Sequence, residues 1–415
     1  MKIMFVVKSK AIETLGCMYL SAIAKANGHE SRIVELENAT IVASVWQPDI
    51  VGMSVLTGNQ DDFISLAETL KLVVPSCRII VGSHHATFFP QDFNGKDFDC
   101  VVQGEAENWM SEFLGSDTRY PNLDSLPFPN REDFPDMPIR DFITSRGCIY
   151  GTCRYCYNDR WNKMFPDMPK VRFRSVDNVI EEIESVKGKF NYFQDSCFGV
   201  SMSWLKDFSN KYREKIDTPF HCHLRPSQVT EERIKLLWRA NCHSVRIALE
   251  TGSDRLRKVI GREKTSNQEA IDAANILAKY GIKLMVQNML SLSESTIQDD
   301  LLTLKVNIEC KPAYAWASIF APYPGTDLGD ECKERGYYTG DYSDITDSFF
   351  DMSVLNFSDE YKMQTYLLQK VFALAVEAQC MPEIEDLTYD NIYKFIHKAM
   401  RKIGDGRMYN NVLQN

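Results

Sequence analysis

The sequence predicts an α/β protein in which a doubly wound parallel sheet is followed by a partial (β/α)6 barrel and then by a mostly helical region. Three observations predict this arrangement. Apolar strands alternate with amphipathic helices over residues 1–115, a proline-rich linker occupies 116–140, and the alternation resumes over 141–330. Strands that alternate with helices form parallel sheets, because a parallel connection needs a crossover. Residues 331–415 have helical spacing and complete the four expected regions.

The first region is expected to be a Rossmann-like domain. Its candidate strands are short apolar runs: Ile3–Val7, Ile33–Leu36, Asp49–Val55, Arg78–Gly82 and Asp99–Val102. Candidate helices span 15–27, closed by Gly28, and 63–72. Ligands of such sheets bind beyond the carboxyl ends of the strands. Polar or small residues stand at those ends: Ser54, Thr57, Gly82, His84, His85, Gly104 and Glu105.

The second βα run begins after the linker, which holds five of the sixteen prolines of the chain. Six candidate strands follow: Asp141–Ser145, Asn191–Gln194, Phe220–Leu224, Ser244–Leu249, Lys283–Met289 and Ala315–Phe320. Ser175 is expected to cap one intervening helix, and Ser266 with Glu269 and Ser295 with Gln298 form capping-box patterns. Six βα units in series can curl into an open barrel, with its active-site loops at the carboxyl ends of the strands.

Composition narrows the class of protein. The chain has 415 residues, 44% of them hydrophobic and 25% charged, which is ordinary globular usage. A formal net charge of -10 argues against a broad nucleic-acid-binding surface. No apolar run approaches the roughly 18 residues that a membrane-spanning helix needs. We therefore expect a cytoplasmic protein with no membrane span and no nucleic-acid partner.

Three of the twelve cysteines are clustered. Cys148, Cys153 and Cys156 have the spacing C-x4-C-x2-C directly after the first strand of the second run. The other nine are scattered and are expected to be core residues: Cys17, Cys77, Cys100, Cys197, Cys222, Cys242, Cys310, Cys332 and Cys380. Three thiolates cannot complete a tetrahedral zinc site, but they fit a [4Fe–4S] cluster with one open iron.

The loop resembles the signature of the radical S-adenosylmethionine (SAM) superfamily, with Tyr155 in the aromatic position and one extra residue between the first two cysteines. The resemblance extends over roughly residues 1–345 and includes 173–175, 193–195, 248–252 and 322–326. It implies that the open iron of the cluster chelates SAM and that reductive cleavage yields a 5′-deoxyadenosyl radical, which abstracts hydrogen from a C–H bond.

The resemblance also implies roles for single residues toward SAM. Tyr155 would flank the adenine, and Asp195 would face the amino group. Glu250 would bind the ribose or the methionine portion, and Gln287 would add a polar contact. No residue of the chain can be assigned a direct catalytic role from this pattern.

An amino-terminal doubly wound domain before the barrel resembles the cobalamin-dependent class, called class B, of the superfamily. By this resemblance, Ser54, Thr57, Gly82, His84, Gly104 and Glu105 would contact cobalamin. The loop after the first strand, Lys8–Thr14, has no histidine to coordinate cobalt. Any bound cobalamin is therefore expected to be base-off, without a histidine ligand from that loop.

These cofactors favour a methyltransferase that methylates an unactivated carbon and consumes two SAM per turnover. The alternative keeps both cofactors, and the substrate radical rearranges, cyclises or couples without methyl transfer. A methylthiotransferase acting on transfer RNA would carry a basic carboxy-terminal β-barrel and further cluster cysteines, and an electron-transfer module would complete its cluster with a fourth cysteine. The sequence shows neither pattern. The expected partners are a flavodoxin- or ferredoxin-type one-electron donor and a small-molecule or peptide substrate.

Overall fold

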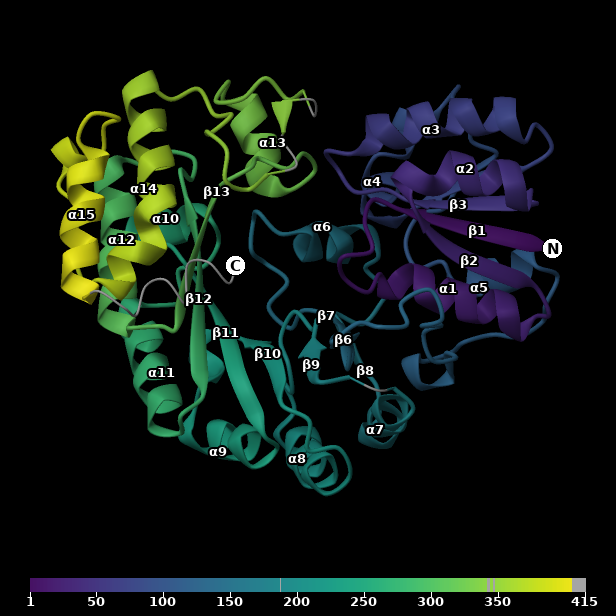
Figure 1. Cartoon of the computed structure of the whole chain (residues 1–415), viewed down its shortest axis with the longest axis horizontal. Coiled ribbons are helices and arrows are strands. Elements are labelled where there is room, and N and C mark those ends of the chain that lie inside the picture. The colour runs from purple at the N-terminus through teal and green to yellow at the C-terminus, as the bar shows by residue number, and fades with distance from the viewer. Residues whose placement is uncertain (187, 342–343, 346–347, 405–415) are drawn as a thin grey trace. The chain divides into compact units, whose positions relative to one another are not determined.

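A computed structural model describes residues 1–404 except 187, 342–343 and 346–347 (Figure 1). The chain divides into two compact units. Unit 1 comprises Met1–Ile143 and Arg172–Tyr192, and unit 2 comprises Thr144–Val171 and the chain from Phe193 onward.

Unit 1 contains a five-stranded parallel sheet with the order β2-β1-β3-β4-β5. The strands are β1 (Lys2–Val7), β2 (Glu30–Glu35), β3 (Ile50–Ser54), β4 (Arg78–Gly82) and β5 (Cys100–Val101). Five helices connect or follow them: α1 (Leu15–Ala26), α2 (Leu36–Trp46), α3 (Gln60–Val73), α4 (Ser83–Phe88) and α5 (Glu107–Phe113). Helices α2 and α3 cover one face of the sheet, and α1 and α5 cover the other (Figure 1). The predicted doubly wound sheet is thus confirmed.

The largest difference from the prediction in unit 1 is at Leu36, whereas the other predicted boundaries shift by at most three residues. Leu36 was assigned to a strand, but it begins α2, a helix that the sequence pattern did not reveal. This helix is rich in β-branched residues, which favour strands in isolation. Ala39, Ala43 and Trp46 form its buried face, and this packing outweighs the local propensity.

All six strands predicted for the second run are present. They are β6 (Ile139–Phe142), β9 (Phe190–Phe193), β10 (Phe220–Leu224), β11 (Cys242–Glu250), β12 (Lys283–Leu290) and β13 (Tyr314–Ile319). In unit 2, β10 to β13 are neighbours in chain order, and every pair is parallel. Two short strands, β7 (Ser145–Gly147) and β8 (Val171–Phe173), precede and follow helix α6 (Tyr157–Met164).

The crossover helices begin at side-chain caps. They are α7 (Val176–Glu184), α8 (Met202–Lys215), α9 (Glu231–Arg239), α10 (Asp254–Val259), α11 (Asn267–Lys279) and α12 (Ile297–Cys310). Ser175 caps α7, and Ser266 forms a capping box with Glu269, as predicted. The capping box predicted at Ser295 is wrong by one residue, since Thr296 and Asp299 form it. The Ser295 hydroxyl instead donates to Asp300.

Helices dominate the carboxy-terminal part of unit 2, as predicted for 331–415, although residues 405–415 lie outside the described residues. They are α13 (Asp327–Glu334), α14 (Asp359–Glu377) and α15 (Ile392–Ile403). Helix α14 packs against α12 and β13, and α15 packs against α14 (Figure 1). This apolar layer covers the outer face of the last two strands and leaves their inner face to a cavity.

Candidate functional site

The three clustered cysteines lie on the loop between β7 and α6, and all three are partly exposed. Gly147, directly before Cys148, has a φ of +93°, and a Cβ atom there would lie 2.0 Å from the carbonyl oxygen of Lys170. Gly151, with a φ of +50°, would bring a Cβ to 2.3 Å from the Asn162 side chain. Only glycine fits these positions, so the path of the loop depends on both.

Arg154 holds the middle of this loop in place. Its backbone N–H donates to Ile260 O at 3.1 Å, and its carbonyl accepts from Leu328 N at 2.9 Å. Its guanidinium donates to Val259 O at 3.0 Å and forms an ion pair with Glu331. The loop is therefore attached to the end of α10 and to α13 before any cofactor is considered.

The environment of Cys148 favours its thiolate. A hydrogen bond with the Cys197 side chain is the largest of the effects that lower the Cys148 pKa to about 5. The backbone N–H groups of Gly151 and Tyr150 and the charge of Arg225 lower it further, against the effect of burial. Sequence reasoning placed Cys197 with the scattered core cysteines. It is indeed buried, but it contacts the first cysteine of the motif.

The environment of the other two cysteines favours the protonated thiol. Burial raises the pKa of Cys153, and it raises that of Cys156 to about 11 although the Asn158 backbone and side chain donate to its sulfur. Cys156 is also the N-cap of α6, where the positive end of the helix favours an anion. Ligation removes a thiol proton, so these positions are protonated until iron binds.

The donor set fits an iron–sulfur cluster. Within the described residues, no group of three or more His, Cys, Asp or Glu side chains converges on a point where one metal ion could bind. In a [4Fe–4S] cluster each thiolate binds a different iron, so three separated sulfurs on one loop are suitable ligands. The assignment of Cys148, Cys153 and Cys156 as those ligands stays a prediction.

Asp195 lies just after β9 and is fully buried. It accepts hydrogen bonds from Thr144 N at 3.0 Å, Thr144 Oγ1 at 2.7 Å and Ser145 Oγ at 2.5 Å. Burial raises its pKa, and these donors oppose the shift. Asp195 therefore orients the segment that leads into the cysteine loop, and its expected contact with the amino group of SAM stays a prediction.

Glu250 ends β11 in an unusual backbone conformation. Its φ is +67°, and the pairing of β11 with β12 shifts register between Ala248 and Glu250. Left-handed backbone at a residue other than glycine is costly and concentrates at functional sites. The bulge turns the buried Glu250 side chain toward the cysteine loop.

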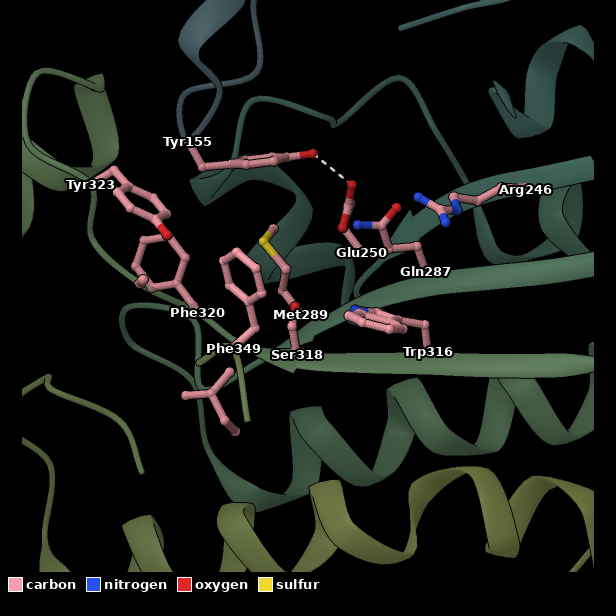
Figure 2. Close-up of a pocket in the computed structure, with 12 residues that line it drawn as sticks. Tyr155, Arg246, Glu250, Gln287, Met289, Trp316, Ser318, Phe320, Tyr323 and Phe349 are labelled. Atoms are coloured by element: carbon pink, nitrogen blue, oxygen red, sulfur yellow. Dashed lines mark hydrogen bonds between the residues drawn. The ribbon is translucent and has the colours of Figure 1, made fainter. Parts of the chain in front are cut away.

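Two side chains bind the Glu250 carboxylate. Tyr155 Oη donates to Glu250 Oε1 at 2.8 Å (Figure 2), and Arg262 Nη1 donates to the same oxygen at 3.0 Å. Arg262 also donates to Ala248 O at 2.8 Å and is 4% exposed. Burial raises the pKa of Glu250, and the Arg262 charge is the strongest opposing effect. Two of the predicted SAM contacts, Tyr155 and Glu250, thus touch each other.

A cavity of about 360 Å³ opens beside this pair. Tyr155, Glu250 and Gln287 line it, so the structure brings three of the four predicted SAM contacts together. The rest of its wall comes from β11, β12, β13 and the segments after β13 (Figure 2): Arg246, Met289, Trp316, Ser318, Ile319, Phe320, Ala321, Tyr323 and Phe349. Asp195 is not part of this wall.

Sequence reasoning missed three arginines of this site. Arg262 binds Glu250, and Arg246 lines the cavity. Arg225 follows β10, lies 3.5 Å above the Tyr150 ring and lowers the pKa of both Cys148 and Glu250. Two of them could have been found from their positions in the sequence, because Arg225 directly follows a buried strand and Arg246 shares the strand β11 with Glu250.

In unit 1, the expected cobalamin contacts lie at or near the carboxyl ends of the strands. Ser54 ends β3 beside Gly82 at the end of β4, and the partly exposed His84 follows in α4. Gly104, with a φ of +78°, donates its N–H to Thr87 Oγ1 at 3.0 Å. Glu105 forms an ion pair with Arg172. None of these contacts tests the cobalamin roles, which stay predictions.

His85 and Thr57 are engaged with protein groups. His85 Nδ1 lies 3.0 Å from Thr57 Oγ1, and His85 Nε2 lies 3.2 Å from Asp92 Oδ2. The His85 ring is fully buried between Phe89 and Phe93. It therefore packs as a core residue.

The loop after β1 contains a buried carboxylate where a cobalt-binding histidine was sought. Glu13 forms ion pairs with Arg131 and Arg140, and its side chain is 0% exposed. Arg131 also pairs with Glu182 at 2.7 Å. This network ties the loop to the proline-rich segment within unit 1.

Two regions of the chain match known protein families. Residues 1–114 match the B12 binding domain, and residues 142–304 match the Radical SAM superfamily. Hopanoid C-3 methylase of Methylococcus capsulatus is 30% identical over 377 residues, 80% of this chain and 70% of that protein. An uncharacterized methyltransferase of Pyrococcus horikoshii is 24% identical over 367 residues, 76% of this chain and 77% of that protein.

A solved structure shares the fold. It is the radical SAM methyltransferase TsrM from Kitasatospora setae with cobalamin and a [4Fe–4S] cluster bound, which superposes with a TM-score of 0.65 at 16% identity. The match covers 80% of this chain and 78% of that chain.

A B12 binding domain followed by a three-cysteine loop on a parallel βα sheet defines an enzyme that combines cobalamin, SAM and a [4Fe–4S] cluster. The chain belongs to the radical SAM superfamily, in its cobalamin-dependent class B group. Across the part of the chain that the structure describes, no helix has the length and apolar content to cross a membrane.

Proposed function

We propose that this enzyme is a methyltransferase that methylates an unactivated carbon of its substrate and consumes two SAM per turnover. One SAM supplies the methyl group as a methyl cation and leaves as S-adenosylhomocysteine. One electron cleaves the other SAM to methionine and a 5′-deoxyadenosyl radical, which takes hydrogen from the substrate, and the substrate radical gains the methyl group together with a second electron from the one-electron donor. The relatives named above as methylase and methyltransferase support this proposal.

The observation that carries the proposal is the cavity of about 360 Å³ whose wall includes Tyr155 and Glu250. Tyr155 lies next to Cys156 in the sequence, so a molecule at this end of the cavity is close to the cysteine loop. In our proposal, Tyr155 flanks the adenine, Glu250 binds the ribose or methionine portion, and Gln287 adds a polar contact. Arg225, beside the cysteines, binds the carboxylate of SAM.

The remaining roles belong to the same proposal. Asp195, which accepts hydrogen bonds from Thr144 and Ser145, faces the amino group of SAM. The strand ends of unit 1 bind cobalamin, and a flavodoxin- or ferredoxin-type protein in the cytoplasm supplies both electrons, one at a time. The cavity suits a small molecule or the side chain of a peptide rather than a nucleic acid.

The test uses SAM with a deuterated methyl group. The reconstituted holoprotein is incubated with this SAM, a reductant and a metabolite extract, and products that gain the label are sought by mass spectrometry. Methyl transfer predicts equal amounts of S-adenosylhomocysteine and 5′-deoxyadenosine and a labelled product. Rearrangement, cyclisation or coupling predicts 5′-deoxyadenosine without stoichiometric S-adenosylhomocysteine and an unlabelled product, and that result would replace our proposal.

A further inference from the structure

Arg246 projects from the middle of β11 into the cavity. It pairs in register with His223 of β10 and Met285 of β12, four residues before Glu250. At about 3.3 Å per residue, the two positions are roughly 13 Å apart along the strand. Figure 2 shows Arg246 and Tyr155 on opposite sides of Glu250. The cavity therefore has one end at the cysteine loop and another at Arg246.

Among the residues that the structure describes, the guanidinium of Arg246 has no counter-ion. Its Nε is buried without a hydrogen-bond partner, and among the described residues no ion pair or hydrogen bond engages its side chain. Arg262 shows the contrast, because it pairs with Glu250 at 3.0 Å. A partly buried cation without a partner is costly, and a fold retains it where a ligand supplies the missing charge.

The neighbouring titratable groups do not supply that charge. Burial is the main cause that lowers the pKa of both His221 and His223, with the Arg246 charge next, so both rings are neutral at pH 7. The Glu250 carboxylate is already neutralised by Arg262. Within the described part of the chain, the end of the cavity at Arg246 thus carries a positive charge that no neighbouring group balances.

Apolar and aromatic side chains form much of the remaining wall. Trp316 of β13 is paired with Gln287 in the sheet, and Met289, Phe320 and Phe349 continue the wall toward Tyr155. A volume of about 360 Å³ is suited to a small molecule. A planar guanidinium binds a carboxylate or phosphate through two parallel hydrogen bonds.

We propose that Arg246 binds an anionic group, a carboxylate or a phosphate, on a small substrate. The apolar or aromatic body of this substrate lies against Trp316 and the wall toward the cysteine loop. The term substrate rests on the proposed function, whereas the anion site itself does not. The reacting carbon would lie several bonds from the anionic group, since the radical forms at the opposite end of the cavity.

The test measures binding to the reconstituted holoprotein without turnover. The probes are 3-phenylpropionate, 2-phenylethyl phosphate and the uncharged 3-phenylpropanamide, followed by calorimetry. We expect at least one anion to bind about tenfold or more tightly than the amide. Arg246→Gln should abolish this preference, Arg246→Lys should keep part of it, and Arg239→Gln, at an exposed position of α9, should leave it unchanged.

Three outcomes would overturn the proposal. Equal binding of the anions and the amide to the unaltered protein would exclude an anion site. A preference that persists in Arg246→Gln would place the site elsewhere. Weaker SAM binding in Arg246→Gln with unchanged anion preference would assign Arg246 to the carboxylate of SAM. Formation of 5′-deoxyadenosine with dithionite tests the radical chemistry separately, so its failure would reject the proposed function and not the anion site.

Discussion

The hydroxyl group of Tyr155 donates a 2.8 Å hydrogen bond to the carboxylate of Glu250. The two residues belong to the cysteine loop and to the end of β11, and they are 95 residues apart in the sequence. This bond links the loop to the sheet in the wall of the cavity, and it fixes a ring and a carboxylate side by side.

We expect Tyr155→Phe to weaken SAM binding about five- to tenfold, because a buried hydrogen bond contributes about 1 kcal/mol and its loss frees the carboxylate to move. Equilibrium dialysis with labelled SAM measures the effect, and iron content should remain unchanged. Tyr389→Phe, at an exposed position, serves as the control. Unchanged SAM binding in Tyr155→Phe would reject a role for this pair toward SAM.

Substitutions should distinguish the three cysteines that bind the cluster from Cys197, which contacts one of them. Replacing Cys148, Cys153 and Cys156 together with alanine should remove the roughly four irons per chain and SAM cleavage. Cys197→Ala should retain the irons but make the cluster harder to reduce, because a hydrogen bond to a ligand sulfur stabilises the reduced form. Iron analysis and a redox titration measure both. Loss of the irons in Cys197→Ala, or their retention in the triple variant, would contradict this assignment.

Cobalamin should bind base-off in unit 1. The loop after β1 offers the buried carboxylate of Glu13 and no histidine, and His85 is enclosed by protein groups. The electron paramagnetic resonance spectrum of the cob(II)alamin form should therefore lack nitrogen superhyperfine splitting. Free base-on cob(II)alamin is the reference for that splitting. A clear axial nitrogen signal from the protein would show that a nitrogen ligand binds cobalt.

Stability should vary with pH through Asp300 of α12. It accepts hydrogen bonds from Tyr361 at 2.7 Å and Thr365 at 3.2 Å, and burial raises its pKa to about 7. In the unfolded chain its pKa is about 3.9. Between these values the unfolded chain has released the proton and the folded chain retains it. The stabilising contribution is therefore full below about pH 4, falls as the pH rises to about 7, and stays constant above.

Asp300→Asn should remove this dependence, because an amide does not titrate. The difference in unfolding free energy between the variant and the unaltered protein should change by about 4 kcal/mol from pH 4 to pH 7, since each pKa unit corresponds to about 1.4 kcal/mol. Urea unfolding at several pH values measures it. A constant difference across this range would show that Asp300 is ionised in the folded protein.

Much of the fold could be predicted from periodicity, because buried strands of a parallel sheet are short apolar runs with turn signals on both sides. The cysteine motif was visible because its residues are close in sequence. Arg225, Arg246 and Arg262 were not predicted, because an arginine on a strand or in a loop is usually a surface residue and only the folded sheet brings these three to the site. Helix α2 was hidden by β-branched residues whose packing appears only in three dimensions.

The attachment of Arg154 to α13 has a consequence for biosynthesis. Its partner Glu331 follows 177 residues later, and Leu328 belongs to the same helix, α13. A ribosome adds about 5–20 residues per second, so roughly 10–35 seconds separate the emergence of the cysteine loop from that of its anchor. During that interval the thiols are exposed on a loop without its final support. Iron loading is therefore expected to follow completion of the barrel, and a scaffold protein that delivers the cluster would act after α13 has been synthesised.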